Sequence, residues 1–234
     1  MQIEVLVDPD AVAARAAALI AEEARTAVAR RKRFVMAVSG GHTPWIMLRV
    51  LAGQEHVPWN NMHVFQVDER VAPQGDADRN FTHLRASLLE RAPLPPAQVY
   101  PMPVEDTDLG AAAKRYATKL GEIAGSPPTL DLVHLGLGPD GHTASLVPGD
   151  AVLGNTDMTV ALTGEYQGRR RMTLTYPVLN DARRILWVVT GSDKARILAR
   201  LQAGDHEIPA GRVRQNNALI LADLAATGSR RQGA

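Results

Sequence analysis

The sequence contains no cysteine, which excludes disulfides, a thiolate nucleophile and cysteine-based metal sites. It has almost no excess of either charge, because 26 basic residues face 25 acidic ones. Nucleic acid or an anionic membrane would need a basic face, so we expect neither as a partner. No apolar run reaches the roughly 18 residues of a membrane span, and no basic start precedes an apolar run at the N-terminus, so no signal peptide is predicted. These absences favour a cytoplasmic protein.

Familiar catalytic signatures are also missing. HExxH is absent and the seven histidines are dispersed, so no metal site is predicted. Ser39 precedes two glycines but lacks the preceding glycine of a GxSxG elbow, which gives a serine nucleophile little support. The turn over residues 39–43 has neither the P-loop pattern nor the spacing of a GxGxxG dinucleotide turn.

What the sequence does contain is an alternation of short apolar runs and amphipathic segments. We predict strands over residues 3–7, 34–38, 62–67, 99–102, 130–137, 171–175, 184–190 and 217–221. Helices are predicted over 11–31, 80–91, 108–124 and 194–201, with another opening at Thr43 and Pro44. This alternation predicts an α/β fold, a mostly parallel, doubly wound (Rossmann-like) sheet with helices on both faces. We expect one domain over 1–228 and a loose C-terminal tail over 229–234.

Two further features of the chain have a structural and a functional interpretation. The basic run over residues 30–33 ends the first helix, where cations favour the negative end of the dipole, and this favours a structural role over nucleic-acid contact. Residues 39–43 form a glycine-rich turn before a helix, which is equally consistent with an anion cradle and with an ordinary tight turn.

Four polar turns are predicted at strand ends, over residues 39–43, 68–70, 136–143 and 191–194. In a doubly wound sheet such ends meet at the ligand-binding edge. His142 lies two residues after the carboxylate of Asp140, so its imidazole could take a proton from water. Arg171 begins a strand, and Lys194 lies in the first turn of a predicted helix, where the dipole disfavours a cation unless it holds a ligand. Each residue alone is also consistent with an ordinary turn or surface.

Five blocks in order carry a resemblance that covers nearly the whole chain. They are AVSGGHTP, FQVDERVAP followed by DADRNF, DLVHLGLGPDGHTASLVPG, RRMTLTYPVLNDARRILWVVTGSDKA, and ADLAA. The combination resembles the 6-phosphogluconolactonase family within the glucosamine-6-phosphate deaminase-like superfamily. His42 and Arg79 depart from residues that the family often has there, so we assign neither a role.

The resemblance implies a cofactor-free hydrolase that opens 6-phospho-D-glucono-1,5-lactone to 6-phosphogluconate in the oxidative pentose phosphate pathway. The resemblance implies that His142 is the general base and that Asp68, Arg70 and Asp140 line the site. Positive side chains or glycine N–H groups would stabilise the oxyanion, and Arg70 is our candidate. The residues implied to bind substrate or its phosphate are Ser39, Gly40, Gly41, Thr43, Asp68, Arg171 and Lys194. The expected partner is this small phosphorylated lactone, and the expected assembly is a monomer or a small homo-oligomer.

Two rival functions are weighed against the lactonase. A glucosamine-6-phosphate deaminase is expected to carry a glutamate after the histidine turn, but residues 143–149 contain no acid before Asp150. A non-catalytic sugar-phosphate sensor of a transcription regulator would need a DNA-binding segment, and the chain starts directly with a predicted strand.

Overall fold

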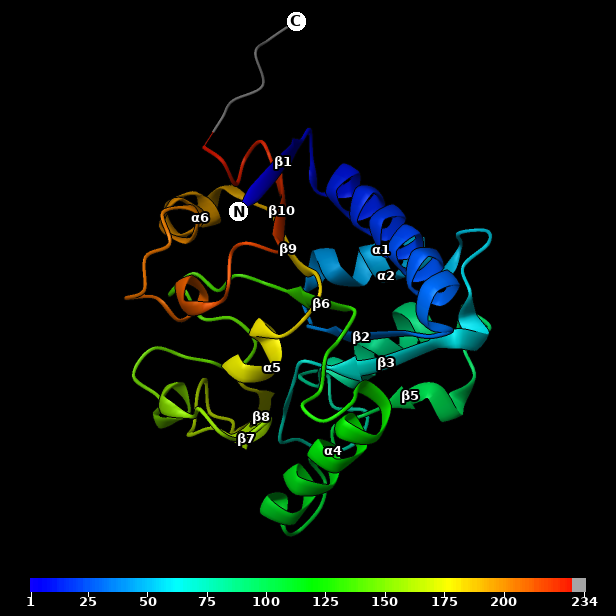
Figure 1. The fold of residues 1–234 in the computed structure, drawn as a ribbon. Helices are drawn as coiled ribbons and strands as arrows, with labels where there is room; N and C mark the ends of the chain where they lie inside the picture. Colours follow the sequence, from blue (N-terminus) through cyan, green and yellow to red (C-terminus); the bar gives the residue numbers. More distant parts are fainter. Residues whose placement is uncertain (229–234) are drawn as a thin grey trace, which may run out of the picture.

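The computed structural model describes residues 1–228, so the predicted tail over 229–234 lies outside the described residues. The main sheet consists of seven strands: β1 (Gln2–Leu6), β2 (Phe34–Val38), β3 (Met62–Gln66), β5 (Val99–Tyr100), β6 (Leu132–Leu135), β9 (Ile185–Val189) and β10 (Ala218–Asp223). Their order is β1-β10-β9-β6-β2-β3-β5, and every neighbouring pair is parallel (Figure 1). The predicted mostly parallel α/β sheet is confirmed.

Helices cover both faces of this sheet. One face packs against α1 (Pro9–Arg31), α2 (His42–Ala52) and α3 (Asn80–Leu84), which continues as a π-helical turn over Arg85–Leu89. The other packs against α4 (Leu109–Ala124), α5 (Tyr176–Asn180) and α6 (Ala195–Gln202). Figure 1 shows α1 and α2 together, well apart from α4. Consecutive β2 residues alternate between the two cores, as strand geometry requires, with Phe34 on the α1 face and Val35 on the α4 face.

Helix α1 ends at the predicted Arg31 and begins at Pro9, two residues before the predicted start. The Asp8 carboxylate accepts a hydrogen bond from the Ala11 N–H at 2.9 Å and caps the N-terminus. The C-cap residue Lys32, directly after the helix, adopts the left-handed conformation. Arg31 pairs with the buried Asp131 carboxylate at 2.7 Å. This part of the basic run therefore has the structural role that we expected.

A second, three-stranded sheet was not predicted. It is antiparallel and contains β4 (Asp68–Arg70), β8 (Arg171–Leu174) and β7 (Val160–Leu162) in that order. The prediction of a turn over residues 68–70 is wrong, because these residues pair with β8, about a hundred residues away in the sequence. Strand formation here depends on this long-range partner, which local sequence patterns do not reveal.

The chain reverses its direction across the sheet beside β2. From β2 it adds β3 and β5 on one side, and from β6 it adds β9 and β10 on the other. Ligands bind in open α/β sheets at such a reversal, outside the carboxyl ends of the strands. Short 3₁₀ turns complete the chain at Trp59–Asn61, Pro96–Gln98, Ala151–Gly154, Ser192–Lys194 and Pro209–Arg212.

Candidate active site

A cleft of about 480 Å³ lies at this reversal, where the turns after β2 and β6 meet the second sheet. It is lined by nearly all of the residues that the sequence singles out: Ser39, Gly40, Gly41, Thr43, Asp68, Arg70, His142, Arg171 and Lys194. Asp140 is not among the lining residues but contacts His142. Residues from four separate turns and strands are therefore brought to one place.

His142 and Asp140 form a close pair in the turn after β6. The His142 Nδ1 atom lies 2.6 Å from the Asp140 Oδ1 atom, which also accepts the backbone N–H of His142 at 3.1 Å. Gly138 lets the ring approach, since a Cβ atom there would lie only 2.1 Å from Nδ1. Burial alone would raise the pKa of Asp140, but its hydrogen bonds and the His142 charge lower it overall. With Nδ1 held by a carboxylate, Nε2 is the ring nitrogen left to act on a substrate.

Tyr166 joins this pair from the hairpin between β7 and β8. Its hydroxyl donates to the Asp140 Oδ2 atom at 3.0 Å, and its ring meets the His142 ring edge-on at 5.3 Å between centroids. Burial, followed by the contact with Asp140, raises the pKa of Tyr166 and keeps its hydroxyl protonated. Sequence analysis missed Tyr166, because nothing in its local sequence links it to a turn 26 residues earlier.

Two arginines face each other across the second sheet. Arg70 and Arg171 are direct partners in the antiparallel β4–β8 register, where like charges are unfavourable. Burial and then the Arg70 charge lower the pKa of Arg171. The Nε atoms of both side chains are buried without a hydrogen-bond partner in the described chain. A bound anion would offset the repulsion and satisfy these donors.

Neighbouring arginines do not duplicate this role equally. Arg169 is paired with the carboxylates of Asp76 at 3.1 Å and Asp78 at 2.9 Å. Its guanidinium is therefore already engaged. Within residues 1–228, the Arg171 guanidinium hydrogen-bonds to the Gln167 side chain at 3.3 Å and lies over the face of Tyr166, and it has no ion pair with a carboxylate within 4 Å.

Two further features supply positive charge and N–H groups to the cleft. Helix α2 begins at Gly41 without a side-chain cap, so its first N–H groups are open to an anion. Lys194 ends a 3₁₀ turn and contacts Asp193 at 3.2 Å. It is the N-cap residue of α6, which begins at Ala195, so the prediction that Lys194 lies inside the first helical turn is wrong by one residue. The Ser39 hydroxyl donates to the His134 carbonyl at 3.1 Å and so holds the turn against β6.

Asp68 is a buried carboxylate on the wall of the cleft. Its Oδ2 atom accepts the Ser145 hydroxyl at 2.6 Å, and its Oδ1 atom accepts the Asn80 amide at 3.3 Å. These bonds orient the Asn80 side chain and leave its Oδ1 atom without a partner in the described residues. That atom packs against Gly40, where a Cβ atom would lie 2.0 Å away. Asn80 and Ser145 are site residues that sequence analysis missed.

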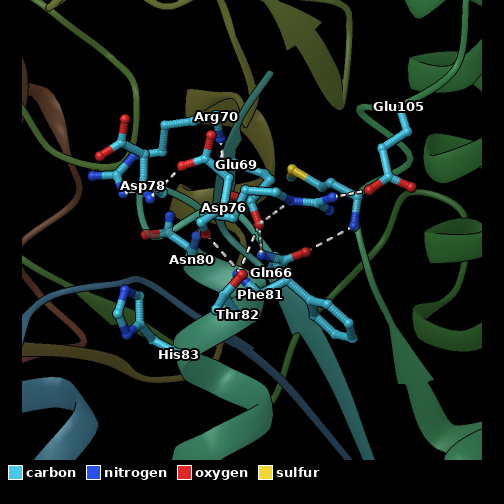
Figure 2. Close-up of polar contacts among 12 residues, drawn as sticks. Gln66, Glu69, Arg70, Asp76, Asp78, Asn80, Phe81, Thr82, His83 and Glu105 are labelled. Atoms are coloured by element: carbon cyan, nitrogen blue, oxygen red, sulfur yellow. Dashed lines mark hydrogen bonds and ion pairs between the residues drawn. The ribbon is translucent and has the colours of Figure 1, made fainter. Parts of the chain in front are cut away.

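Glu69, the neighbour of Asp68, is the centre of a buried network (Figure 2). Its two carboxylate oxygens accept four hydrogen bonds of 2.8–2.9 Å, from the Gln66 side chain and from the backbone N–H groups of Arg70, Asn80 and Phe81. Glu69 therefore fixes both Arg70 and Asn80, which line the cleft. We call these five residues the Glu69 network.

The Glu69 carboxylate caps the N-terminus of α3, because the residue directly before this helix does not. The N-cap residue of α3 is Arg79, whose side chain makes no capping bond and instead lies 3.7 Å from Glu69 and pairs with Glu105. The first N–H groups of a helix need an acceptor when they are buried. The unusual arginine at this position was thus the sequence signal that a distant carboxylate would serve as the cap.

The described residues contain no group of three histidine or acidic side chains arranged to hold a metal ion. Within residues 1–228, no helix is both long and apolar enough to cross a membrane.

Comparisons with known proteins agree in one family. The profile of the glucosamine-6-phosphate isomerases/6-phosphogluconolactonase family matches residues 7–221. The chain is 35% identical to a 6-phosphogluconolactonase of Nostoc sp. over 232 residues, covering 96% of each chain. It is 36% identical over 234 residues to that of Mycobacterium tuberculosis, covering 94% of this chain and 95% of the relative.

Solved structures of the same shape include a 6-phosphogluconolactonase from Thermotoga maritima, with a TM-score of 0.83, 28% identity and coverage of 95% and 98% of the two chains. A monomeric glucosamine-6-phosphate deaminase has a TM-score of 0.84 at 18% identity, covering 98% of this chain and all of that one. The second likeness concerns the fold alone.

Proposed function

The chain belongs to the glucosamine-6-phosphate isomerase/6-phosphogluconolactonase family, and from this membership we propose that it hydrolyses 6-phospho-D-glucono-1,5-lactone to 6-phosphogluconate. The observation that carries the proposal is the His142–Asp140 pair at 2.6 Å, in a cleft that also contains two facing arginines. Such a cleft combines a general base with a seat for an anionic substrate.

The reaction begins with water. The His142 Nε2 atom takes a proton from a water molecule as its oxygen attacks the C1 carbonyl of the lactone. Asp140 accepts the Nδ1–H, holds the ring in the tautomer whose Nε2 is free, and stabilises the imidazolium that forms. General-base assistance of this kind contributes roughly 10²–10⁴-fold to the rate.

Attack produces a tetrahedral oxyanion at C1. Arg70 is our candidate to stabilise it, because Glu69 holds its backbone and its Nε atom is buried without a partner in the described chain. The C1–ring oxygen bond then breaks, and the imidazolium of His142 returns its proton to the departing oxygen. The product is the open-chain acid, and His142 is again neutral.

The 6-phosphate anchors the substrate. Arg171, Lys194 and the open N–H groups at the start of α2 supply positive charge in the same cleft. Anchoring makes the attack effectively intramolecular. It also gives the site a reason to prefer a phosphorylated lactone, because each lost charge-assisted contact is worth about 1.5–3 kcal/mol.

The rival functions receive less support from this site. Asp150 is the first acid after His142, and its carboxylate caps the N–H of Val152 at 2.9 Å and accepts the N–H of Gly164 at 2.9 Å. It is thus engaged in local structure, which argues against a ring-opening acid of the deaminase type. A sensor would need no base, and the His142–Asp140 pair would then have no use.

The same proposal covers the cofactor requirement, the cellular compartment and the assembly. We propose that the enzyme needs no cofactor, acts in the cytoplasm, and is a monomer or a small homo-oligomer. The lack of cysteine in the sequence suits a reducing compartment.

The proposal is tested by generating the lactone with glucose-6-phosphate dehydrogenase and following its disappearance with and without this protein. Spontaneous hydrolysis is subtracted at each pH. We expect kcat/KM for the phosphorylated lactone to exceed that for glucono-δ-lactone by roughly 10²–10⁴-fold, as two lost charged contacts imply. Equal values would contradict the phosphate site, and release of ammonia from glucosamine 6-phosphate would favour the deaminase.

A further inference from the structure

Tyr166 contacts both the catalytic pair and an arginine of the cleft. We propose that it is a positioning residue, whose hydroxyl fixes Asp140 against His142 and whose ring covers Arg171. The inference rests on the proposed function, because it assigns a role within the same site. It concerns orientation only, since Tyr166 acts through these three residues and takes no part in the bond changes.

The hydroxyl completes the coordination of Asp140. One carboxylate oxygen, Oδ1, is taken by the ring and backbone nitrogens of His142, at 2.6 and 3.1 Å. The other, Oδ2, accepts the Tyr166 hydroxyl at 3.0 Å. Because both oxygens are held, the carboxylate cannot rotate away from the imidazole without breaking one of these bonds. The direction of the Nε2 lone pair is thereby set by Tyr166 as well as by Asp140.

The ring of Tyr166 covers the buried arginine. The Arg171 Cζ atom lies 4.9 Å from the Tyr166 ring centroid, within the range of a cation–π interaction. Arg171 is only 4% exposed, so its guanidinium has lost most of its contact with water. It also faces Arg70 across the sheet, and the two positive charges repel each other. The aromatic face offsets part of both, and it holds the guanidinium at the wall of the cleft.

The hairpin that carries Tyr166 is itself rigid. Tyr166 and Arg169 exchange backbone hydrogen bonds of 3.0 and 3.3 Å around a two-residue loop. The loop residues Gln167 and Gly168 have φ of 53° and 73°, the left-handed values of a type I′ turn. Arg169 ties the hairpin to Asp76 and Asp78 at 3.1 and 2.9 Å. Tyr166 is therefore presented from a fixed support.

Two substitutions separate the two contacts. Tyr166→Phe removes the hydroxyl and keeps the ring, so the contacts with the Asp140 Oδ2 atom at 3.0 Å and the His142 Nδ1 atom at 3.4 Å are lost, and the ring still covers Arg171. Tyr166→Ala removes these contacts and the ring contact. Tyr176→Phe is a matched control, because that hydroxyl donates to the Pro209 carbonyl at 2.9 Å and its ring is not part of the cleft lining.

Tyr166→Phe should change the pH profile as well as the rate. Without the hydrogen bond from the tyrosine hydroxyl, the negative charge of Asp140 is less stabilised. It therefore attracts the imidazolium of His142 more strongly. The groups that face this pair are Tyr166 and Arg171 from the hairpin side, with Asp68 and Arg70 from β4 and Lys194 across the cleft. The variant leaves all of them in place except the hydroxyl. In a profile of kcat/KM against pH, the acid limb is the fall in kcat/KM at low pH as the base becomes protonated. The midpoint of this limb should therefore move to a pH about half a unit higher, and kcat should fall about tenfold.

Tyr166→Ala should add an effect on binding. Uncovering Arg171 should raise KM for the phosphorylated lactone about two- to fivefold beyond the Phe variant, as the loss of one cation–π contact implies. Wild-type kcat and an unmoved acid limb in Tyr166→Phe would overturn the role of the hydroxyl. A KM in Tyr166→Ala equal to that of Tyr166→Phe would overturn the role of the ring.

A readout that needs no activity separates this inference from the proposed function. The ring resonances of His142 can be titrated by NMR in the ligand-free wild type, Tyr166→Phe and Tyr176→Phe proteins. We expect the midpoint to move upward in Tyr166→Phe alone. An unchanged His142 titration midpoint would contradict the inference even if the protein is an active lactonase. A changed midpoint in a protein without lactonase activity would contradict only the proposed function.

Discussion

Asp140 and Glu69 are two carboxylates that hold residues lining one cleft, and their surroundings are opposite. The Asp140 side chain is 35% exposed and contacts two groups that can themselves gain, lose or share a proton, the His142 ring and the Tyr166 hydroxyl. The Glu69 side chain is fully buried, and its four hydrogen bonds come from an amide and from backbone N–H groups. Asp140 therefore lies beside a ring whose charge changes during the proposed reaction, whereas the groups that donate to Glu69 stay neutral.

The difference shows how the site divides its work. A carboxylate that must respond to a proton on its neighbour keeps few bonds and some contact with water, because a fully satisfied buried charge resists change. A carboxylate that must hold three segments together needs every bond. We therefore expect substitutions near Asp140 to reduce catalysis at nearly constant stability, and substitutions at Glu69 to reduce stability first.

The largest effect is expected at His142. His142→Ala should lower kcat by about 10²–10⁴-fold, the usual contribution of a general base, while the protein stays folded and still binds 6-phosphogluconate. Steady-state kinetics and binding calorimetry measure the two quantities. His206→Ala, which alters an exposed histidine that does not line the cleft, is the control. A folded His142→Ala protein with near wild-type kcat would place the base elsewhere, first at Asp68 or Asp140.

Glu69→Gln should show the opposite pattern. It places an amide donor against backbone N–H groups and takes one charge away from buried Arg79, so unfolding should become easier by about 3–5 kcal/mol. Urea unfolding measures this. Glu105→Gln removes the other, 47% exposed partner of Arg79 and should change stability by less than about 1 kcal/mol. Equal effects of the two variants would show that the Glu69 network is not the support described above.

His134 gives the buried side of the site a pH dependence. Burial lowers the pKa of His134 from an ordinary value near 6.5 to about 4. Because the unfolded chain takes up this proton first, stability from the neutral imidazole is full above about pH 6.5 and is lost as the pH falls toward 4, by about 3 kcal/mol.

The measurement is urea unfolding between pH 7 and 4 for the wild type and His134→Asn. The asparagine oxygen can still accept the Ser39 N–H, which now donates to the His134 Nδ1 atom at 3.2 Å, but it does not titrate. The difference between the two proteins should shrink toward acid pH. Parallel curves would mean that His134 does not sense pH within the fold.

The smallest effect is expected at Lys194, which, like Asp140, is partly exposed to solvent. Its side chain is 21% exposed and contacts only Asp193 among acidic groups within 4 Å in the described chain. Lys194→Ala should raise KM for the phosphorylated lactone roughly tenfold, with kcat and stability little changed, since the contact exists in both ground and transition states. Lys114→Ala on the exposed face of α4 is the control. An unchanged KM would remove Lys194 from the site.

The fold was largely predictable, because its parallel strands and long helices carry strong local patterns. His142 and Asp140 stood out because both lie in one contiguous turn at a strand end. Glu69 and Tyr166 did not, since each acts on a partner 11 to 26 residues away. The short β4 strand escaped for the same reason, as its pairing with β8 decides its conformation. The roles of the predicted site residues remain predictions.

The placement of β1 at the edge of the main sheet has a consequence for biosynthesis. Gln2 of β1 is in register with Leu219 of β10, so β1 is synthesised more than about two hundred residues before the strand that pairs with it in the described sheet. Until then β1 presents an unpaired edge together with Ile3, Val5 and Val7, which stay exposed even in the finished structure. Folding is therefore expected to close with β1, and the nascent chain needs protection from aggregation until β10 has been made.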